Sequence, residues 1–289
     1  LSFLVFTIIC CCFNLQPICS QTHQPAYGIF YSDGSSASLQ QLIDSARSTD
    51  VTFIGELHDN PIAHWIQRRI LDSLIAGDHC TPMLGMEMLE RDQQVILDEY
   101  LSGLITEDYY LDHMRLWPNY RTDYHPMVLT AKEHEVPVYA TNIPRRYADG
   151  VYRSGPLYLD SLGNEAENWI PQPYITPDTS LQSYGSLLEM GAVHGGSENL
   201  LHAQAVKDAL MAEVIAKHYR PESCFLHLNG AFHSDYNEGI AWYLNQLKEA
   251  LDILTMTTVR QEHISDLDDQ HKGKADFILC VPADMTKTH

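Results

Sequence analysis

The chain has 289 residues, 45% of them hydrophobic, and a formal net charge of −20. This length and apolar content suit one large α/β domain, or one domain that carries a substantial insertion. Because an acidic surface repels phosphate backbones and anionic bilayers, the composition argues against nucleic acid as a partner.

The first twenty residues differ in character from the rest of the chain. Residues 1–15 carry no charge and are mostly apolar, which is short for a membrane span but typical of the hydrophobic part of a secretory signal. We therefore expect a signal peptide over residues 1–20, with cleavage after Ser20, and export of the mature protein. Residues 21–289 are then expected to form a single α/β domain.

The seven cysteines fall into two groups, one inside the expected signal and one outside it: Cys10, Cys11, Cys12 and Cys19; and Cys80, Cys224 and Cys280. An odd number at wide spacing predicts no disulfide framework in the mature protein. Cys224 and Cys280 lie in apolar runs, where a cysteine usually behaves as a small buried apolar residue. One of the early cysteines is a candidate for lipid attachment, as in a lipoprotein.

Short apolar runs alternate with helix-like stretches along the chain. This pattern predicts an α/β fold, with a mostly parallel sheet flanked by helices. The expected strands are Val51–Ile54, Pro82–Glu87, Val136–Thr141, Cys224–Leu228, Leu254–Val259 and Asp276–Val281. The expected helices are Ser38–Ser48, Asn60–Ala76, Arg91–Ser102, Thr106–Leu116, His125–Glu135, Glu198–His218 and Glu238–Leu251.

The pattern weakens around residues 143–197, where tyrosines are scattered among Pro and Gly. A stretch of this length without clear elements is usually functional or mobile in a compact domain. We interpret it as a helical and irregular insertion that covers the crevice at the carboxyl ends of the strands.

Four of the expected strands run into a polar group that is able to bind a metal or carry a proton. Glu56 and His58 follow the first, Glu87 the second, Asn142 the third and His233 the fourth. In open parallel sheets, ligands bind in the crevice outside the carboxyl ends of the strands. We therefore expect these side chains to converge there, although they lie far apart in the sequence.

Simpler interpretations compete with a functional site. Glu56 and His58 also suit a hydrogen-bonded turn before a helix, and Glu87 also suits a salt bridge with Arg91 or Arg115. A buried charge needs such a partner or a metal. The repeated spacing of Gly-Glu-Leu-His and Gly-Ala-Phe-His after two separate strands favours a site over chance.

Several other polar residues are weaker candidates, each more often a packing or surface residue than a ligand. Gln204 and Asp208 share one face of a helix, since they are four residues apart. The supporting candidates are His64, Tyr124, Asn142, Gln204 and Asp208, and two further histidines, His194 and His202, flank a glycine pair.

Several enzyme classes lack their motifs. The sequence has no phosphate-binding Gly-x-x-x-x-Gly-Lys-Ser/Thr loop, no Gly-x-Gly-x-x-Gly after a strand, and no His-Glu-x-x-His zinc motif. It has neither the Gly-x-Ser-x-Gly elbow of serine hydrolases nor the Cys-x-x-Cys-His of covalent haem attachment.

A series of motifs between Val51 and His233 carries a family resemblance. They are Gly-Glu-Leu-His-Asp-Asn-Pro at 55–61, Gly-Met-Glu-Met at 85–88, Trp-Pro-Asn-Tyr at 117–120, Tyr-His-Pro at 124–126, Ala-Thr-Asn-Ile-Pro-Arg at 140–145, Ala-Gln-Ala-Val-Lys-Asp at 203–208 and Asn-Gly-Ala-Phe-His at 229–233. In order and spacing they resemble the ChaN-like family of haem-binding, iron-regulated proteins. This family is related to Tiki metalloproteases, TraB proteins and erythromycin esterases.

The resemblance implies a parallel α/β sheet with a helical cover and haem as the ligand. It implies haem acquisition at the cell surface or in the periplasm, often by a lipoprotein anchored in the outer membrane, with outer-membrane haem transport components as partners. It also suggests a homodimer with stacked haems and a tyrosine as the axial iron ligand. The candidates for the axial ligand are Tyr147, Tyr152, His194 and His202.

The metalloprotease branch of the same group implies another use of the strand-end residues. There Glu56, His58, Glu87 and His233 would be ligands of a divalent metal that activates a water molecule. Two functions of different class therefore remain: a haem-binding protein, and a secreted divalent-metal-dependent hydrolase. In a third interpretation, the crevice is a degenerate site in a structural surface protein.

Overall fold

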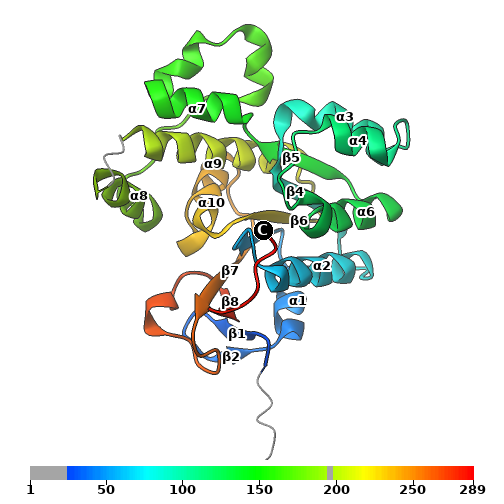
Figure 1. Cartoon of the computed structure of the whole chain (residues 1–289), viewed down its shortest axis with the longest axis vertical. Helices are drawn as coiled ribbons and strands as arrows, with labels where there is room; N and C mark the ends of the chain where they lie inside the picture. Colours follow the sequence, from blue (N-terminus) through cyan, green and yellow to red (C-terminus); the bar gives the residue numbers. More distant parts are fainter. Residues whose placement is uncertain (1–24, 194–197) are drawn as a thin grey trace, which may run out of the picture.

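A computed structural model describes residues 25–193 and 198–289 of the protein. Its centre is an eight-stranded sheet (Figure 1). The strands are β1 (Gly28–Tyr31), β2 (Ser36–Ala37), β3 (Val51–Glu56), β4 (Thr81–Glu90), β5 (Val138–Asn142), β6 (Ser223–Gly230), β7 (Ile253–Gln261) and β8 (Phe277–Pro282). Their order across the sheet is β2-β1-β8-β7-β3-β6-β4-β5. The strands from β8 to β5 are all parallel, and β1 and β2 add an antiparallel edge.

This architecture confirms the predicted α/β class with a mostly parallel sheet. The sequence pattern missed β1 and β2, which are four and two residues long. Strands this short give no clear alternation of apolar and polar residues, which is the signal that predicts a strand.

The helices are α1 (Leu39–Arg47), α2 (Pro61–Ile75), α3 (Gln94–Leu101), α4 (Glu107–His113), α5 (Tyr120–Asp123), α6 (His125–Glu133), α7 (Arg145–Ser154), α8 (Gln182–Val193), α9 (Asn199–His218) and α10 (Ile240–Leu247). Short 3₁₀ helices are η1 (Arg91–Gln93), η2 (Pro156–Ser161), η3 (Asn164–Trp169), η4 (Ala231–His233), η5 (Asp235–Asn237) and η6 (Asp269–His271). In the described ranges, no helix is both long enough and apolar enough to cross a membrane.

Helices cover both faces of the sheet, so the central strands are buried on both sides. In β3, Ile54 packs into the core under α1, α2 and α6, whereas Val51 and Phe53 point into the opposite core under α9 and α10. Figure 1 shows these two helical layers on either side of the strands. Burial of one such side chain contributes about 1.5–3 kcal/mol to the stability of the fold. Because the strands are buried on both faces, they appear in the sequence as continuous apolar runs.

The described part of the expected insertion is largely helical. It comprises α7, η2, η3 and α8, which lie with α9 on one side of the sheet (Figure 1). Ile143, Val151 and Leu159 are buried against Val206 and Leu210 of α9. This segment therefore packs on the domain through its own apolar contacts. The expected signal peptide at 1–20 lies outside the described residues, as does His194.

A disulfide joins Cys80 to Cys224, so the prediction of no disulfide was wrong. Cys80 directly precedes β4, and β4 pairs with β6 so that Pro82 lies opposite Cys224. The parallel pairing thus brings together two cysteines that are 144 residues apart in sequence. Their spacing in the sequence does not predict this contact. Cys280 is buried in β8, as expected.

Candidate functional site

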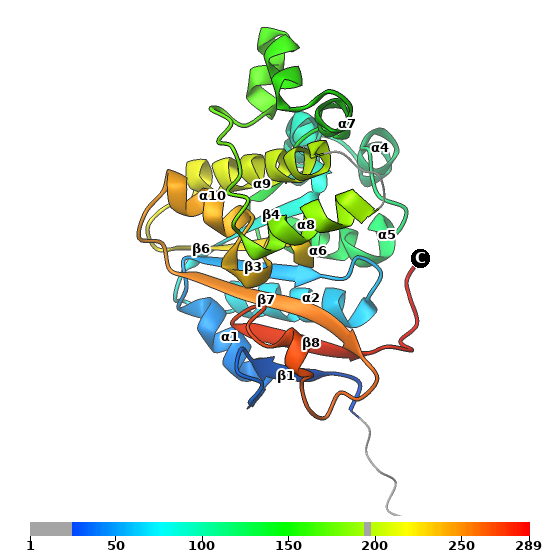
Figure 2. The ribbon, with the colours of Figure 1, turned by 90° about the vertical axis from the view of Figure 1, so that its left-hand side faces the viewer.

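Four of the five strand-end residues come together at the carboxyl edge of the sheet, and Asn142 lines a neighbouring cavity with Glu87. Glu56, His58, Glu87 and His233 all line one cavity of about 680 Å³ at the carboxyl edge of the sheet. Figure 2 shows β3, β7 and β8 pointing toward the same side of the molecule, where the C-terminal segment also lies. The parallel topology therefore produces the convergence, because it brings all these strand ends to one edge.

The turn between β3 and α2 sets the position of His58. The Asn60 side chain accepts the N–H groups of Ile62 (3.0 Å) and Ala63 (2.9 Å), and Pro61 occupies the first helical position. This capping stops the chain from extending past the sheet and starts the helix at once. His58 is thereby held at the rim of the crevice.

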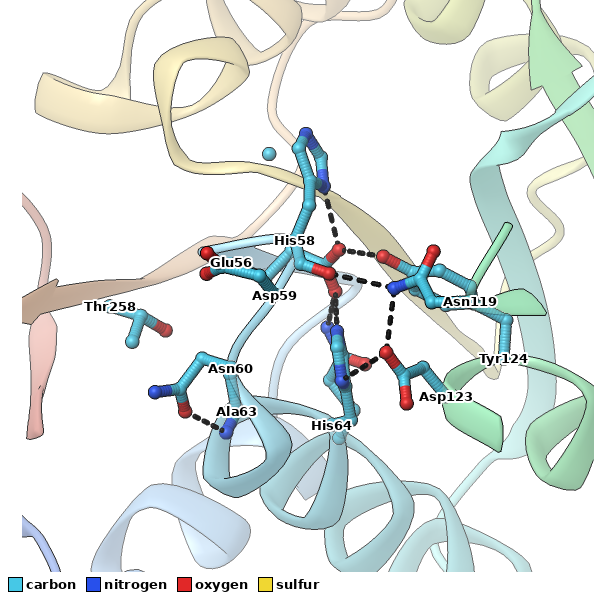
Figure 3. A network of polar contacts seen from close by, with 12 residues as sticks. Glu56, His58, Asp59, Asn60, Ala63, His64, Asn119, Asp123, Tyr124 and Thr258 are labelled. Carbon is cyan, nitrogen blue, oxygen red and sulfur yellow. Dashed lines mark hydrogen bonds and ion pairs between the residues drawn. The ribbon is translucent and has the colours of Figure 1, made fainter. Parts of the chain in front are cut away.

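Glu56 is the centre of the first polar network (Figure 3). The His58 Nδ1 atom lies 2.8 Å from Glu56 Oε1, and the Tyr124 hydroxyl donates to the same oxygen. The Gln67 amide donates to Oε2, and His64 Nε2 lies 3.5 Å from that oxygen. Burial alone would raise the pKa of Glu56, but His58 and His64 outweigh it and lower the pKa to about 2. Glu56 is therefore an ionised carboxylate surrounded by donors.

The orientation of the His58 ring follows from this carboxylate. An ionised carboxylate only accepts hydrogen bonds, so Nδ1 is the protonated nitrogen and the neutral ring keeps a lone pair on Nε2. Burial lowers the pKa of His58, but the hydrogen bond to Glu56 and the charge of Glu87 raise it overall. The Trp117 ring packs edge-on against the imidazole, with 4.8 Å between centroids. The His58 side chain remains 39% exposed.

A second layer of polar groups supports this network. The Asn119 amide donates to the His58 carbonyl oxygen (2.8 Å) and to Asp123 Oδ2 (2.6 Å). Asp123 Oδ2 also lies 3.3 Å from His64 Nδ1 and accepts the Thr288 hydroxyl (2.6 Å). The segment after β8 is thus tied to the same cluster as the turn after β3.

Glu87 and His233 belong to a second network on the other side of the crevice. The Gly230 N–H donates to Glu87 Oε2 (2.7 Å), and His233 Nε2 lies 3.1 Å from Glu87 Oε1. His233 Nδ1 bonds to Asp208, whose other oxygen accepts the Tyr184 hydroxyl (2.7 Å). Burial lowers the pKa of His233, but Glu87 and Asp208 outweigh it and raise the pKa to about 9. At neutral pH His233 is therefore an imidazolium between two acids.

The competing interpretation of Glu87 as an arginine partner does not hold. Arg115 pairs with Glu90 and Asp92, and Arg91 bonds to the Gln94 side chain. Burial raises the pKa of Glu87, but the charge and hydrogen bond of His233 hold it well below its ordinary value.

The two networks remain separate sets of acid and imidazole. Each carboxylate is occupied by its own histidine, Glu56 by His58 and Glu87 by His233. Within residues 25–193 and 198–289, no group of three or more His, Cys, Asp or Glu side chains is arranged to hold a metal ion. The alternative of a divalent metal held by all four residues therefore gains no support from the geometry.

The crevice continues past His58 into a second cavity. This cavity has a volume of about 880 Å³ and shares His58, Glu87 and Lys207 with the first. Both volumes fall in the usual range for ligand and cofactor sites, about 300–1,000 Å³. Apolar walls line the first cavity: Leu57, Leu187, Ala231, Phe232 and Val259.

Lys207 of α9 is a cationic side chain of the crevice. The half-buried side chain lines both large cavities and a third one of about 280 Å³. It forms no ion pair with any described acid, whereas the crevice residue Arg260 pairs with Asp59 and Lys274 pairs with Asp235. Lys207 is thus a cation that remains available for an anionic ligand.

Comparisons with known proteins agree with this geometry. The family described as "Haem-binding uptake, Tiki superfamily, ChaN" matches residues 42–244. The chain belongs to this family. No curated protein matches the chain.

Two solved structures share the fold of this ChaN-family chain, and a third is less similar to it. ChaN of Campylobacter jejuni, described with cofacial haem binding, has 19% identity and a TM-score of 0.66, over 88% of this chain and 96% of that chain. A Bacillus cereus protein has 12% identity and a TM-score of 0.51, over 89% and 95% of the two chains. An erythromycin esterase has 10% identity and a TM-score of 0.49, over 84% and 92%.

The residues present in the crevice of this ChaN-family protein fit haem. The apolar macrocycle of haem matches walls such as Leu57 and Phe232, and the haem iron matches the exposed His58 imidazole. The propionates match a cation such as Lys207. When bound, haem would supply an iron centre, and these side chains would hold the group in the crevice.

The weaker site candidates lie in different places in the structure. Asn142 and Tyr152 line the third cavity together with Glu87, and Tyr152 is 47% exposed. The Gln204 amide contacts the His233 ring, 2.9 Å from Nδ1. His64, Tyr124 and Asp208 belong to the two networks, as described above.

Two of the axial candidates are engaged elsewhere. The Tyr147 hydroxyl accepts a hydrogen bond from Arg146 (3.2 Å). The His202 ring bonds to the Tyr174 hydroxyl (3.1 Å) and lines none of the three crevice cavities.

Several members of the site were not predicted from the sequence. Gln67 lies three residues after His64, on the same face of α2, so a helical spacing argument would have found it. Asp123 precedes the candidate Tyr124, but nothing in the sequence distinguishes it from a surface acid. Lys207 lies next to the candidate Asp208, and only the tertiary structure shows that it faces the crevice.

Proposed function

We propose that this protein binds haem in the crevice at the carboxyl ends of β3, β4 and β6, as part of a haem acquisition system at the cell surface. One observation carries the proposal: an apolar-walled crevice, with an exposed imidazole and a cation without an acid partner, lies in a chain of a haem-binding family. The fold shared with a haem-binding ChaN protein is consistent with it.

The way in which haem enters the crevice follows from its lining. Phe232 is 55% exposed at the mouth of the first cavity, where it is available to stack on a flat macrocycle. Lys207 lies where the cavities meet and is placed to pair with a propionate. The otherwise acidic protein would repel a dianionic ligand elsewhere on its surface.

Export is the second part of the proposal. A Cys80–Cys224 disulfide suits an oxidising compartment, since disulfides seldom persist in the cytosol. The apolar, uncharged residues 1–15 suit a secretory signal, with an early cysteine as a candidate lipid anchor. We place the mature protein at the cell surface or in the periplasm, delivering haem to outer-membrane transport components.

We propose a homodimer as the third part, and only the family resemblance supports it. Two copies with their crevices facing each other would bury the exposed face of each haem, and haem would then favour association. Sedimentation of the protein with and without haemin tests this, since a monomer at every haemin concentration would contradict it.

The central experiment is a titration of the purified chain with haemin, followed by optical absorption. We expect a shifted Soret band that saturates at a fixed ratio of haem to protein. An unchanged haemin spectrum at stoichiometric protein would overturn the proposal. A hydrolase gains no specific support, because both acids of the strand-end cluster are already occupied by histidines.

A further inference from the structure

We propose that residues 285–289 form a strap which closes the mouth of the crevice and must be released before a ligand enters. This inference adds regulation to the crevice of the proposed function, and it rests on that function for the identity of the ligand. The strap itself is defined by contacts within the chain, so its closure is measurable without haem.

The path of the chain after β8 brings the strap to the crevice. β8 ends at Pro282, and the Ala283 N–H still donates to the Gln261 carbonyl oxygen of β7 (3.0 Å). The Met285 N–H then donates to the Pro282 carbonyl oxygen (3.1 Å), which closes a turn. Figure 2 shows the segment rising from this turn past the ends of β7 and β3. The strap belongs to no helix or strand, so its position depends on its contacts with the rest of the protein.

Two adjacent residues fasten the strap. The Thr288 N–H donates to the Asp59 carbonyl oxygen (3.0 Å), and the Thr288 hydroxyl donates to Asp123 Oδ2 (2.6 Å). Lys287 Nζ lies 2.8 Å from Asp59 Oδ2. Asp59 also pairs with Arg260, so one carboxylate holds both the strap and the end of β7. The strap thus bridges the turn after β3 and helix α5, which lie on two sides of the crevice mouth.

The strap occupies space that a large ligand needs. Four residues line both the 680 Å³ cavity and the 880 Å³ cavity, namely His58, Glu87, Lys207 and His289. The first three belong to the body of the domain, whereas His289 belongs to the strap. A rigid macrocycle that spans both cavities would therefore displace His289, because both occupy the place where the cavities meet.

One carboxylate also connects the strap to the polar network inside the crevice. Asp123 Oδ2 accepts the Thr288 hydroxyl and the Asn119 amide, and it lies 3.3 Å from His64 Nδ1. His64 Nε2 in turn lies 3.5 Å from Glu56 (Figure 3). The position of the strap and the arrangement of the network are therefore coupled. By linkage, a ligand that binds only when the strap is released also favours its release.

The contacts of the strap are weak enough to break and re-form. The Lys287 side chain is 58% exposed, and an ion pair at such a position contributes little in water. Thr288 is only half-buried. When a ligand binds only the open state, its apparent affinity is reduced by the fraction of molecules that are open. Loosening the strap should therefore speed and strengthen binding in the crevice.

The first test measures release of the strap in the full chain. A double variant, Lys287→Gln with Thr288→Val, removes both side-chain anchors and leaves every residue of the two cavity linings unchanged. Thr286→Val is the matched control, because Thr286 is exposed and its side chain bonds to no described residue. We expect hydrogen exchange of residues 285–289 to be about threefold to tenfold faster in the double variant, and unchanged in the control.

The second test measures access to the crevice without haem. Ala231→Cys places a thiol in the wall of the first cavity, while the free Cys280 is buried in β8. We expect a maleimide to react with this thiol about threefold to tenfold faster when the double variant is added, with deletion of residues 285–289 as the upper limit. Equal rates with and without the strap would overturn the proposal.

The third test uses haemin and separates the inference from the proposed function. We expect the double variant to bind haemin faster than the wild type, and bound haemin to speed exchange of the wild-type strap. If haemin binds but slows that exchange, the strap is part of the ligand seat, so the proposal is overturned and haem binding stands. If haemin leaves the spectrum unchanged while the maleimide reaction still depends on the strap, the proposed function fails and the strap remains the gate of the crevice.

Discussion

The backbone of Gly230 lies directly beside the His58 ring: a methyl group on Gly230 would come within 2.7 Å of Nε2 and 2.8 Å of Cε1. The φ angle of Gly230 is −62°, which any residue adopts, so the lack of a side chain matters here for space alone. The end of β6 thus leaves room for an imidazole that comes from the end of β3.

Gly230→Ala is expected to displace His58 from this position. The added methyl group has no space, so we expect a stability loss of about 1–3 kcal/mol and an altered haem spectrum. Urea unfolding and a haemin titration measure the two effects. Gly163→Ala is the control, because a methyl group there meets no atom within 4 Å. Equal behaviour of the two variants would contradict the close packing of His58 on Gly230.

Lys207→Gln is expected to weaken haem binding by about threefold to tenfold, on the order of 1 kcal/mol, since a partly exposed ion pair contributes little more. Lys207→Arg should retain most of the affinity. The measurement is a titration with haemin and with a haem whose propionates are esterified. We expect the esterified haem to bind the wild type and Lys207→Gln equally.

Lys217→Gln supplies the matched control for that titration, because Lys217 lies exposed in the last turn of the same helix. A loss of affinity in Lys217→Gln as large as in Lys207→Gln would mean that only the net charge of the protein matters.

His227 is expected to make the fold sensitive to acid. Its ring is buried between Thr141 and Asn229, and burial lowers its pKa to about 4. Between the ordinary histidine pKa and about 4, the unfolded chain binds a proton that the folded chain does not. Stability should therefore fall as the pH drops below about 6.5, by up to about 1.4 kcal/mol per pH unit from this group.

The test is urea unfolding of the wild type and of His227→Gln at pH 7 and at pH 5. The variant should be less stable at pH 7 because it loses buried hydrogen bonds, but its stability should change less between the two pH values. An unchanged pH dependence in His227→Gln would show that another group is responsible.

The Cys80–Cys224 disulfide is expected to stabilise the protein. It closes a loop of 144 residues in sequence, and removal of a native disulfide typically costs about 2–5 kcal/mol. Cys80→Ser should therefore melt at a lower temperature than the wild type. A reductant should lower the melting temperature of the wild type but not that of the variant. Equal melting of oxidised and reduced wild type would contradict this.

Chelation distinguishes haem binding from metal-dependent hydrolysis. We expect a chelator to leave haem binding unchanged, because the proposed contacts come from side chains of the crevice rather than from a divalent ion. The hydrolase alternative predicts about one divalent ion per chain, lost in Glu87→Ala and in His233→Ala, together with chelator-sensitive cleavage of an ester or amide. Metal analysis of the purified protein and of both variants decides between them.

The sequence predicted the parts of this protein that depend on local pattern and on general topology. Apolar runs predicted the six parallel strands because these strands are buried on both faces. The convergence of Glu56 and His233 followed because all parallel strands end at one edge of the sheet. The last expected helix is shorter than the pattern suggested, since α10 ends at Leu247 rather than Leu251.

The remaining features depend on tertiary contacts that leave no local signal. Cys80 and Cys224 meet only because β4 pairs with β6. The division of the strand-end residues into two acid–imidazole sets depends on how α9 presents Asp208 to His233. No spacing in the sequence specifies how α9 is rotated about its own axis, so a single four-residue cluster was the simpler expectation.

The segment after β8 returns to the crevice: Thr288 bonds to Asp123, and His289 lines both large cavities. A polyhistidine affinity tag fused after His289 would therefore place additional histidine side chains at the mouth of the proposed haem site. Such a tag would itself offer imidazole ligands to the haem iron, and it would give a histidine-type spectrum whatever the native ligand is. Ligand assignments for this protein accordingly need chains without a tag at that end.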